Sequence, residues 1–130
     1  MREQELVRRA LEMRSFAYAP YSGFRVGAAL ECEDGAVYTG CNVENAAYGS
    51  SICAERTALV KAVSEGKRRF ARLAVAGDSA DYCWPCGACR QMLREFGTEL
   101  VILTANRAGE FERHTLEELL PHSFGPSTLE

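Results

Sequence analysis

The sequence predicts an α/β fold: a three-layer α/β/α sandwich in which helices cover both faces of a five-stranded mixed sheet. Two observations favour this fold. Segments with helical and with strand-like periodicity alternate along the chain in the order α-β-β-α-β-α-β-β-α. One strand-like segment, LVILTA at residues 100–105, is apolar at nearly every position, which is typical of a strand buried on both faces.

The chain of 130 residues has a net charge of −3 and 47% hydrophobic residues, which is the composition of one folded domain spanning residues 1–130. No apolar run reaches the ~18 residues that a membrane span needs. The charged N-terminal stretch lacks the apolar segment of a secretory signal, so we expect a cytoplasmic protein. The absence of a large basic cluster argues against a polynucleotide partner but allows a nucleoside-sized ligand.

The first half of the chain predicts a helix, a hairpin and a second helix. Apolar residues recur at helical spacing in the first segment, and the Ala-Pro-Tyr-Ser-Gly stretch after it would end that helix. The Asp34-Gly35 pair is the strongest hairpin signal in the chain, because these residues readily adopt the backbone angles of a tight turn. Ser50 or Ser51 can cap the next helix, which Gly66 would end. The predicted segments are helix 4–18, strands 24–31 and 36–41, and helix 53–65.

The second half predicts strands on either side of a third long helix. Pro85 is well placed to open this helix, since its missing N–H group costs nothing in a first turn, and Gly97 would close it. The predicted segments are strand 72–76, helix 86–96, strands 100–105 and 111–115, and a short helical end at 116–120.

Six cysteines are many for a chain expected in a reducing compartment, where they indicate metal binding or catalysis more often than disulfides. Cys86 and Cys89 form a Cys-x-x-Cys pair at a helix start, which brings two sulfurs to one side of the first turn. Cys53, at the start of another helix, can supply a third sulfur. Zinc is the metal that three thiolates match best, and with three protein ligands its fourth position stays open for water.

Two charged residues lie two and three positions after Cys53 in the chain. Glu55 projects from the same first turn without being forced to bind the metal, and a carboxylate there can move protons during a hydrolysis. Three thiolates outweigh the +2 charge of zinc, so neighbouring positive charge should matter. Arg56 and the two helix N-termini are the sources of such charge.

On spacing alone, two other interpretations of the cysteines stay open. Cys83 precedes Cys86 by three positions, so four cysteines could close a structural zinc site in a non-catalytic protein. A redox pair of the thioredoxin type would need only Cys86 and Cys89. That interpretation leaves the third cysteine and the glutamate after it unexplained.

Taken together, the motifs resemble the small homotetrameric cytidine deaminases almost from end to end of the chain. The resemblance implies the cytidine deaminase-like fold, one Zn²⁺ per subunit, and hydrolysis of cytidine and 2′-deoxycytidine to uridine and 2′-deoxyuridine with release of ammonia. A cytosine-containing nucleoside antibiotic such as blasticidin S is the alternative substrate. The matching stretches are YAPYSGFRVG at 18–27, GCNVEN at 40–45, CAER at 53–56, PCGAC at 85–89 and LPHSFG at 120–125.

The resemblance also implies roles for the residues of the metal site. Cys53, Cys86 and Cys89 match the zinc ligands of the family. Glu55 matches the proton shuttle, which moves a proton from the attacking water to N3 of the pyrimidine and then to the departing ammonia. Arg56 matches a residue that moderates the thiolate charge through hydrogen bonds to sulfur.

Further matches concern the substrate. Asn42 and Glu44 correspond to residues that hold the ribose hydroxyls, and the backbone at Ala54 and Cys86 is expected to contact the base and the reacting centre. Phe24 matches an aromatic ring that packs against the nucleoside, although strand alternation alone would place it in the core.

Two aromatic residues match positions near a subunit interface. Phe124 corresponds to a ring that reaches into the pocket of a neighbouring subunit, whereas without the resemblance it would dock on its own core. Tyr48 matches a loop residue at the interface. The resemblance therefore implies a homotetramer in which active sites are shared between subunits, with a small-molecule nucleoside as substrate and no membrane or nucleic-acid polymer as partner.

Overall fold

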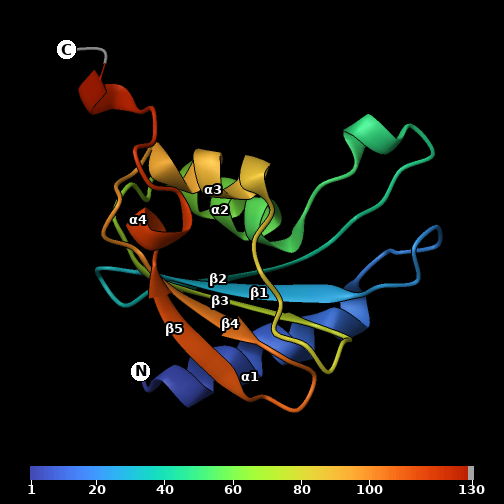
Figure 1. Ribbon diagram of the computed structural model, residues 1–130. Helices are drawn as coiled ribbons and strands as arrows, with labels where there is room; N and C mark the ends of the chain where they lie inside the picture. Colours follow the sequence, from blue (N-terminus) through green and yellow to red (C-terminus); the bar gives the residue numbers. More distant parts are fainter. Residues whose placement is uncertain (129–130) are drawn as a thin grey trace.

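Residues 1–128 are described by the computed structural model of the chain (Figure 1). Its centre is a five-stranded sheet with strand order β2-β1-β3-β4-β5. The strands are β1 (Val26–Cys32), β2 (Val37–Cys41), β3 (Phe70–Gly77), β4 (Val101–Ala105) and β5 (Phe111–Thr115). The helices are α1 (Glu3–Met13), α2 (Ala54–Ser64), α3 (Gly87–Arg94) and α4 (Leu116–Leu119), with 3-10 turns η1 (Arg14–Phe16), η2 (Tyr48–Ser50) and η3 (Pro126–Thr128).

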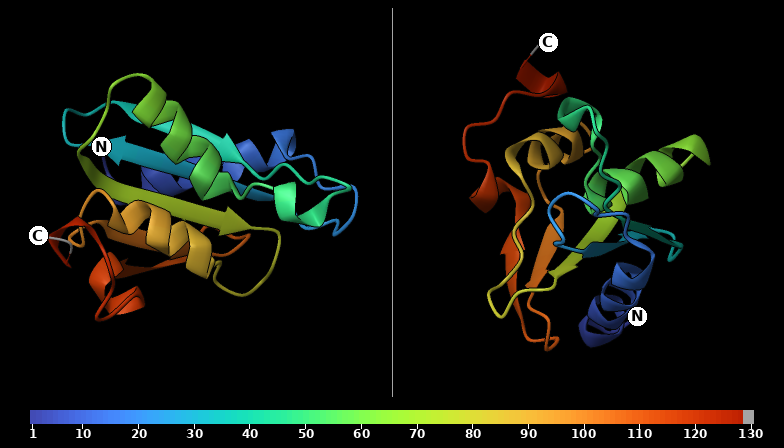
Figure 2. Two further views of the ribbon diagram at one scale, coloured as in Figure 1. Left: turned by 90° about the horizontal axis from the view of Figure 1, so that it is seen from above. Right: turned by 90° about the vertical axis from the view of Figure 1, so that its right-hand side faces the viewer.

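Helices lie on both faces of the sheet. One face is covered by α1 and the other by α2, α3 and α4 (Figure 1, Figure 2). The strands β3 and β4 pair in parallel, whereas the other neighbours pair antiparallel. The predicted three-layer sandwich around a mixed five-stranded sheet is thereby confirmed. Within residues 1–128, no helix is long and apolar enough to cross a membrane.

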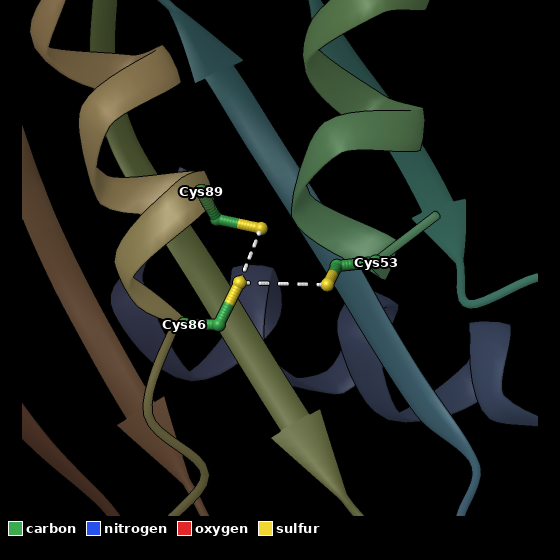
Figure 3. Close-up of side chains that lie close together, drawn as sticks. All are labelled: Cys53, Cys86 and Cys89. Carbon is green, nitrogen blue, oxygen red and sulfur yellow. Dashed lines mark hydrogen bonds between the residues drawn. The ribbon is translucent and has the colours of Figure 1, made fainter. Parts of the chain in front are cut away.

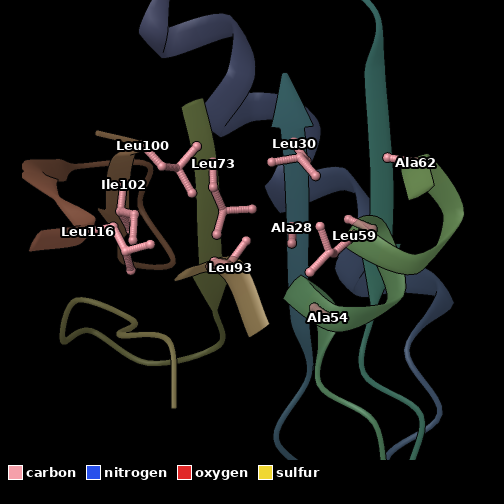
Figure 4. Close-up of a cluster of buried hydrophobic side chains, with 11 residues drawn as sticks. Ala28, Leu30, Ala54, Leu59, Ala62, Leu73, Leu93, Leu100, Ile102 and Leu116 are labelled. Carbon is pink, nitrogen blue, oxygen red and sulfur yellow. The ribbon is translucent and has the colours of Figure 1, made fainter. Parts of the chain in front are cut away.

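Alternation along the strands divides the core into two clusters. Because successive strand side chains point to opposite faces, Leu30 and Leu73 pack with Leu59 of α2 and Leu93 of α3 in one cluster (Figure 4). The second cluster lies against α1 on the other face. Its buried members are Leu6, Val7, Ala10, Ala29, Ala74, Ala76, Leu103 and Ala105.

Three strands end at the same edge of the sheet. Since β1 runs antiparallel to both β2 and β3, and β3 runs parallel to β4, the carboxyl ends of β2, β3 and β4 lie together. The chain passes from β2 into α2 and from β3 into α3. The N-termini of α2 and α3 therefore begin near one edge, which is where parallel strands commonly place a ligand.

Some element bounds differ from those predicted. The first helix ends at Met13 and continues as η1, so the Ala-Pro-Tyr-Ser-Gly stretch is not what ends it. The first strand begins at Val26 rather than at Phe24. The Asn42 side chain accepts a hydrogen bond from the Val26 N–H and donates one to the Phe24 carbonyl, groups that a longer strand would use for pairing.

Two glycines let helices from opposite layers approach the sheet. A Cβ atom on Gly27 would lie 1.8 Å from the Ala10 carbonyl oxygen of α1. On the other face, a Cβ atom on Gly40 would lie 2.5 Å from the Ala54 carbonyl oxygen of α2. Both contacts are with backbone atoms, so neither helix can make room by changing a side-chain rotamer.

We expect Gly27→Ala to destabilise the fold by ~3 kcal/mol, because the added methyl group forces α1 away from the sheet. Gly49→Ala is the matched control, since a Cβ atom there meets nothing within 4 Å, and it should change stability by less than ~0.5 kcal/mol. Urea unfolding measures both values. Equal midpoints for the two variants would contradict the close approach of α1.

Candidate active site

Three cysteine sulfurs meet between the first turns of α2 and α3 (Figure 3). The Sγ atoms of Cys53 and Cys86 are 3.6 Å apart, and those of Cys86 and Cys89 are 3.3 Å apart. Cys53 is the N-cap of α2, Cys86 is the N-cap of α3, and Cys89 lies in the first turn of α3. Cys89 is buried, Cys53 is half-buried and Cys86 is exposed.

The strand order accounts for this meeting. Cys53 is twelve positions from the end of β2 and Cys86 is nine from the end of β3, yet both stand where a helix starts at one sheet edge. The one-turn spacing within α3 then brings Cys89 to the same side as Cys86. Helix N-termini carry partial positive charge, which favours the thiolate form of the cysteines.

A guanidinium group adds full positive charge beside the sulfurs. Arg56 donates hydrogen bonds to the Ser51 carbonyl at 3.1 Å and to the Cys53 sulfur at 4.0 Å. A hydrogen bond from the Cys89 thiol, with further ones from Cys86 and Arg56, holds the pKa of Cys53 well below its usual range. The bond to Cys53, together with burial, raises the pKa of the Cys89 thiol. One of the sulfurs is thus already favoured as a thiolate.

The sulfur cluster fits a zinc ion. All three Sγ atoms lie within 4.8 Å of one another, and tetrahedral zinc with bonds of ~2.3 Å would hold sulfurs about 3.8 Å apart. Only small side-chain movements separate these two arrangements. Among the described residues, the cluster consists of Cys53, Cys86 and Cys89, and Cys83 is not part of it. This argues against the closed four-cysteine site, and the position of Cys53 argues against an isolated redox pair.

Glu55 lies against the same cluster from the first turn of α2. The residue is only 4% exposed. Burial raises the pKa of its carboxyl group to about 7, although its own backbone N–H and the neighbouring Cys89 side chain lower it in part. A carboxyl group that is neutral and ionised in comparable amounts near pH 7 is suited to accept and return protons.

Phe24 is outside the core, contrary to what strand alternation alone suggests. Its ring is 39% exposed and lies over Gly77 at the carboxyl end of β3, where an added Cβ atom would come within 2.6 Å of the ring. Asn42 holds the chain that directly follows this ring, through the Phe24 carbonyl at 2.9 Å and the Val26 N–H at 2.8 Å. The amide of Asn42 keeps one N–H donor free of these two bonds.

Glu44 lines a hollow of about 340 Å³ together with Tyr21, Ser22, Tyr48 and Ser51. Its carboxylate accepts hydrogen bonds from the backbone N–H groups of Tyr21 and Ser22, both at 3.0 Å. The Tyr48 ring, which is 74% exposed, meets the Tyr21 ring edge-on at 5.7 Å. The hollow adjoins the metal cluster through Ser51, whose carbonyl accepts the hydrogen bond from Arg56.

Phe124 does not join the other predicted site residues within one chain. The segment that carries it lies on the opposite side of the helices from the loop that carries η2 (Figure 1). Gln91 and Arg94 of α3 hold this segment through the Phe124 carbonyl at 2.8 Å and the Ser123 hydroxyl at 2.6 Å. The Phe124 ring is left 61% exposed.

Sequence reasoning did not single out Ser22 or Tyr21 as functional residues. Both lie within the YAPYSGFRVG stretch that carries the family resemblance. The resemblance marks this stretch as functional but does not show which of its side chains act. The partner of Ser22 is Glu44, which lies in a loop beyond the β1–β2 hairpin, and the sequence alone does not reveal that contact.

Comparison with known proteins shows the family to which the chain belongs. The family model described as the cytidine and deoxycytidylate deaminase zinc-binding region matches residues 1–105. The chain belongs to this family. A cytidine deaminase of Sporosarcina psychrophila is 49% identical over 128 residues, which cover 97% of this chain and 93% of that protein. One of Mycobacterium tuberculosis is 43% identical over 121 residues, covering 92% of this chain and 87% of the relative.

Solved structures of cytidine deaminases have the same fold as this chain. The crystal structure of a cytidine deaminase from Burkholderia pseudomallei has a TM-score of 0.92 and 46% identity, covering 95% of this chain and all of that one. The resemblance drawn from the motifs is confirmed, and zinc is the cofactor that the family and the cysteine cluster indicate.

We expect Cys89→Ser to lose zinc and Cys83→Ser to retain one zinc per chain, because only the first removes a sulfur from the cluster. Metal analysis after dialysis measures the ratio, and circular dichroism confirms that both variants are folded. Loss of zinc from Cys83→Ser alone would restore the closed four-cysteine site.

The buried Glu55 carboxyl should make the metal-free protein sensitive to pH. In the unfolded chain this group ionises near its ordinary value of 4.5, whereas its pKa in the folded protein is about 7. The folded state therefore loses stability as the pH rises between these values. Glu55→Gln cannot ionise, so it should gain about 3 kcal/mol relative to the native sequence from pH ~4.5 to pH ~7.5.

Denaturant unfolding of the two chelator-treated proteins across this range measures the gain. Glu55→Gln also changes the hydrogen bonds of this side chain. Any effect of that change that does not depend on pH cancels when the stability difference between the two proteins is compared across pH. A stability difference that stays constant with pH would show that the carboxyl group is not held in a raised-pKa environment.

Proposed function

We propose that this chain, as one deaminase domain over residues 1–130, hydrolyses cytidine and 2′-deoxycytidine to uridine and 2′-deoxyuridine with release of ammonia. The observation that carries the proposal is the Glu55 carboxyl, buried against three sulfurs that can hold zinc. Relatives named as cytidine deaminases, similar over almost the whole chain, support the choice of substrate. Cytidine and 2′-deoxycytidine undergo the same reaction, because in both of them water attacks C4 of the cytosine ring.

The metal and the carboxyl group divide the chemistry. Zinc, when held by Cys53, Cys86 and Cys89, supplies a Lewis acid that makes water a stronger acid near neutral pH. Glu55 accepts a proton as the water oxygen bonds to C4, and donates it to N3 of the ring. The carboxylate then takes the second proton and delivers it to the amino group, so the C4–N bond breaks and ammonia leaves. Cytidine and water become uridine and ammonia, and Glu55 ends in its initial state.

Other residues of the chain orient the nucleoside. Glu44 and Asn42 are proposed to bind the sugar hydroxyls, since a carboxylate accepts hydrogen bonds and an amide both accepts and donates them. The exposed Phe24 ring offers an apolar surface at the same sheet edge. The backbone of Ala54 is fixed in the first turn of α2, between the sulfur ligand and Glu55. These contacts would hold C4 at the metal and N3 at the carboxyl group.

A homotetramer with shared active sites is also part of the proposal. Phe124 and Tyr48 are both largely exposed residues, and aromatic residues are enriched at protein interfaces. Gln91 and Arg94 fix the segment that presents Phe124, so the ring is held out from its own chain. We also propose that the protein is cytoplasmic, because a reducing compartment keeps the cysteines of such a site as free thiols.

Glu55→Gln should lower turnover of cytidine by about 10²–10⁴-fold, since glutamine cannot transfer the protons. The loss of absorbance of the cytosine ring, together with ammonia release, measures the rate. The variant should keep one zinc per chain because Glu55 is not a sulfur ligand. Glu117→Gln, at an exposed glutamate of α4, is the matched control and should retain the native rate. Full activity of Glu55→Gln would remove the proposed shuttle.

A further inference from the structure

The Glu44 carboxylate is held by a single short turn. Its Oε1 atom accepts hydrogen bonds from the backbone N–H groups of Tyr21 and Ser22, each at 3.0 Å, and its Oε2 atom accepts one from the Ser22 hydroxyl. An ionised carboxylate offers roughly four acceptor positions. Three are therefore filled by the protein, which leaves one on Oε2 for a ligand.

The direction of the Ser22 hydroxyl follows from its partners. Its oxygen also receives the backbone N–H of Phe24 at 3.0 Å. Since an N–H group can only donate and an ionised carboxylate can only accept, the hydroxyl hydrogen must point to Glu44. The Ser22 hydroxyl thus links two residues. One is Glu44, whose carboxylate is proposed to bind the sugar, and the other is Phe24, whose ring is proposed to face the base.

We propose that Ser22 is a positioning residue, which aims the one open acceptor site of Glu44 at a single sugar hydroxyl of the substrate. The inference rests on the proposed function, because Glu44 binds a sugar only if the ligand is a nucleoside. Without the hydroxyl, Oε2 would lose its anchor while Oε1 kept the two backbone bonds. The carboxylate could then rotate about its last bond, and ordering it again would weaken binding.

The surroundings of Glu44 are consistent with this role. The hydrogen bond from the Ser22 hydroxyl is the main reason why the pKa of Glu44 is lowered, so the group stays an acceptor at neutral pH. Glu44 and Ser22 both line the hollow of about 340 Å³ beside η2. A ligand in this hollow would therefore lie against Glu44.

The test compares ligands with and without the 2′ and 3′ hydroxyls of the sugar, in the zinc-loaded enzyme. Ser22→Ala should raise the KM for cytidine about tenfold, the cost of losing a hydrogen bond to a charged group. The kcat should change less than about twofold. For 2′,3′-dideoxycytidine, which lacks the 2′ and 3′ hydroxyls that Glu44 is proposed to bind, the KM should match that of the native enzyme.

Calorimetry gives a readout that does not need turnover. Uridine should bind Ser22→Ala about tenfold more weakly, and 2′,3′-dideoxyuridine should bind both proteins equally. Ser22→Thr retains a hydroxyl and should restore the binding of uridine. Ser64→Ala removes an exposed serine hydroxyl that donates to the Lys61 carbonyl at the far end of α2, so it is the matched control and should bind as the native protein does.

Each contrary result has a distinct meaning. If Ser22→Ala weakens the binding of ligands with and without the 2′ and 3′ hydroxyls by the same factor, or weakens neither, the positioning role is overturned while deamination stands. If the native protein neither deaminates cytidine nor binds uridine, the proposed function is overturned, and the role of Ser22 with it.

Discussion

The meeting of two helix N-termini at one edge of the sheet is the constraint on which the candidate site depends. With β1 antiparallel to both its neighbours and β3 parallel to β4, the chain enters α2 and α3 from the same side. The first turns of these helices supply all three sulfurs and the Glu55 carboxyl. Their backbone N–H groups and the Arg56 guanidinium together offset the negative charge that the sulfurs concentrate. The metal site is thus a product of strand order, and no single loop could form it.

Features that depend on local sequence could be predicted. The hairpin at Asp34-Gly35, the helix that follows Pro85 and the apolar strand at residues 100–105 each arise from the preferences of adjacent residues, and each is present. The cysteine cluster could also be anticipated, because cysteine has few uses in a reducing compartment and the Cys86–Cys89 spacing matches one helical turn. For these elements, the conformational preferences of adjacent residues match the structure that forms.

Features that depend on distant partners could not be predicted from the residues alone. The ring of Phe24 lies outside the core because the Asn42 side chain, which directly follows β2, binds the backbone where β1 would otherwise begin. The link from Ser22 to Glu44 spans the whole β1–β2 hairpin. The raised pKa of Glu55 depends on how deeply α2 is buried. Only the family resemblance pointed to Phe24 and Glu44 in advance, because strand alternation placed Phe24 in the core and Glu44 on its own is an ordinary polar residue of a loop.

At one point of the sheet, helices on both faces approach its backbone closely. Gly27 faces α1 and Gly40 faces α2, and these positions are offset by one step of the β1–β2 register, since Gly27 pairs with Cys41 and Gly40 with Ala28. On both sides the contact is between main-chain atoms. A defect here could not be rescued by trimming a neighbouring side chain, so compensating second-site changes should be rare. The distance between α2 and the sheet is therefore set by contact between main-chain atoms.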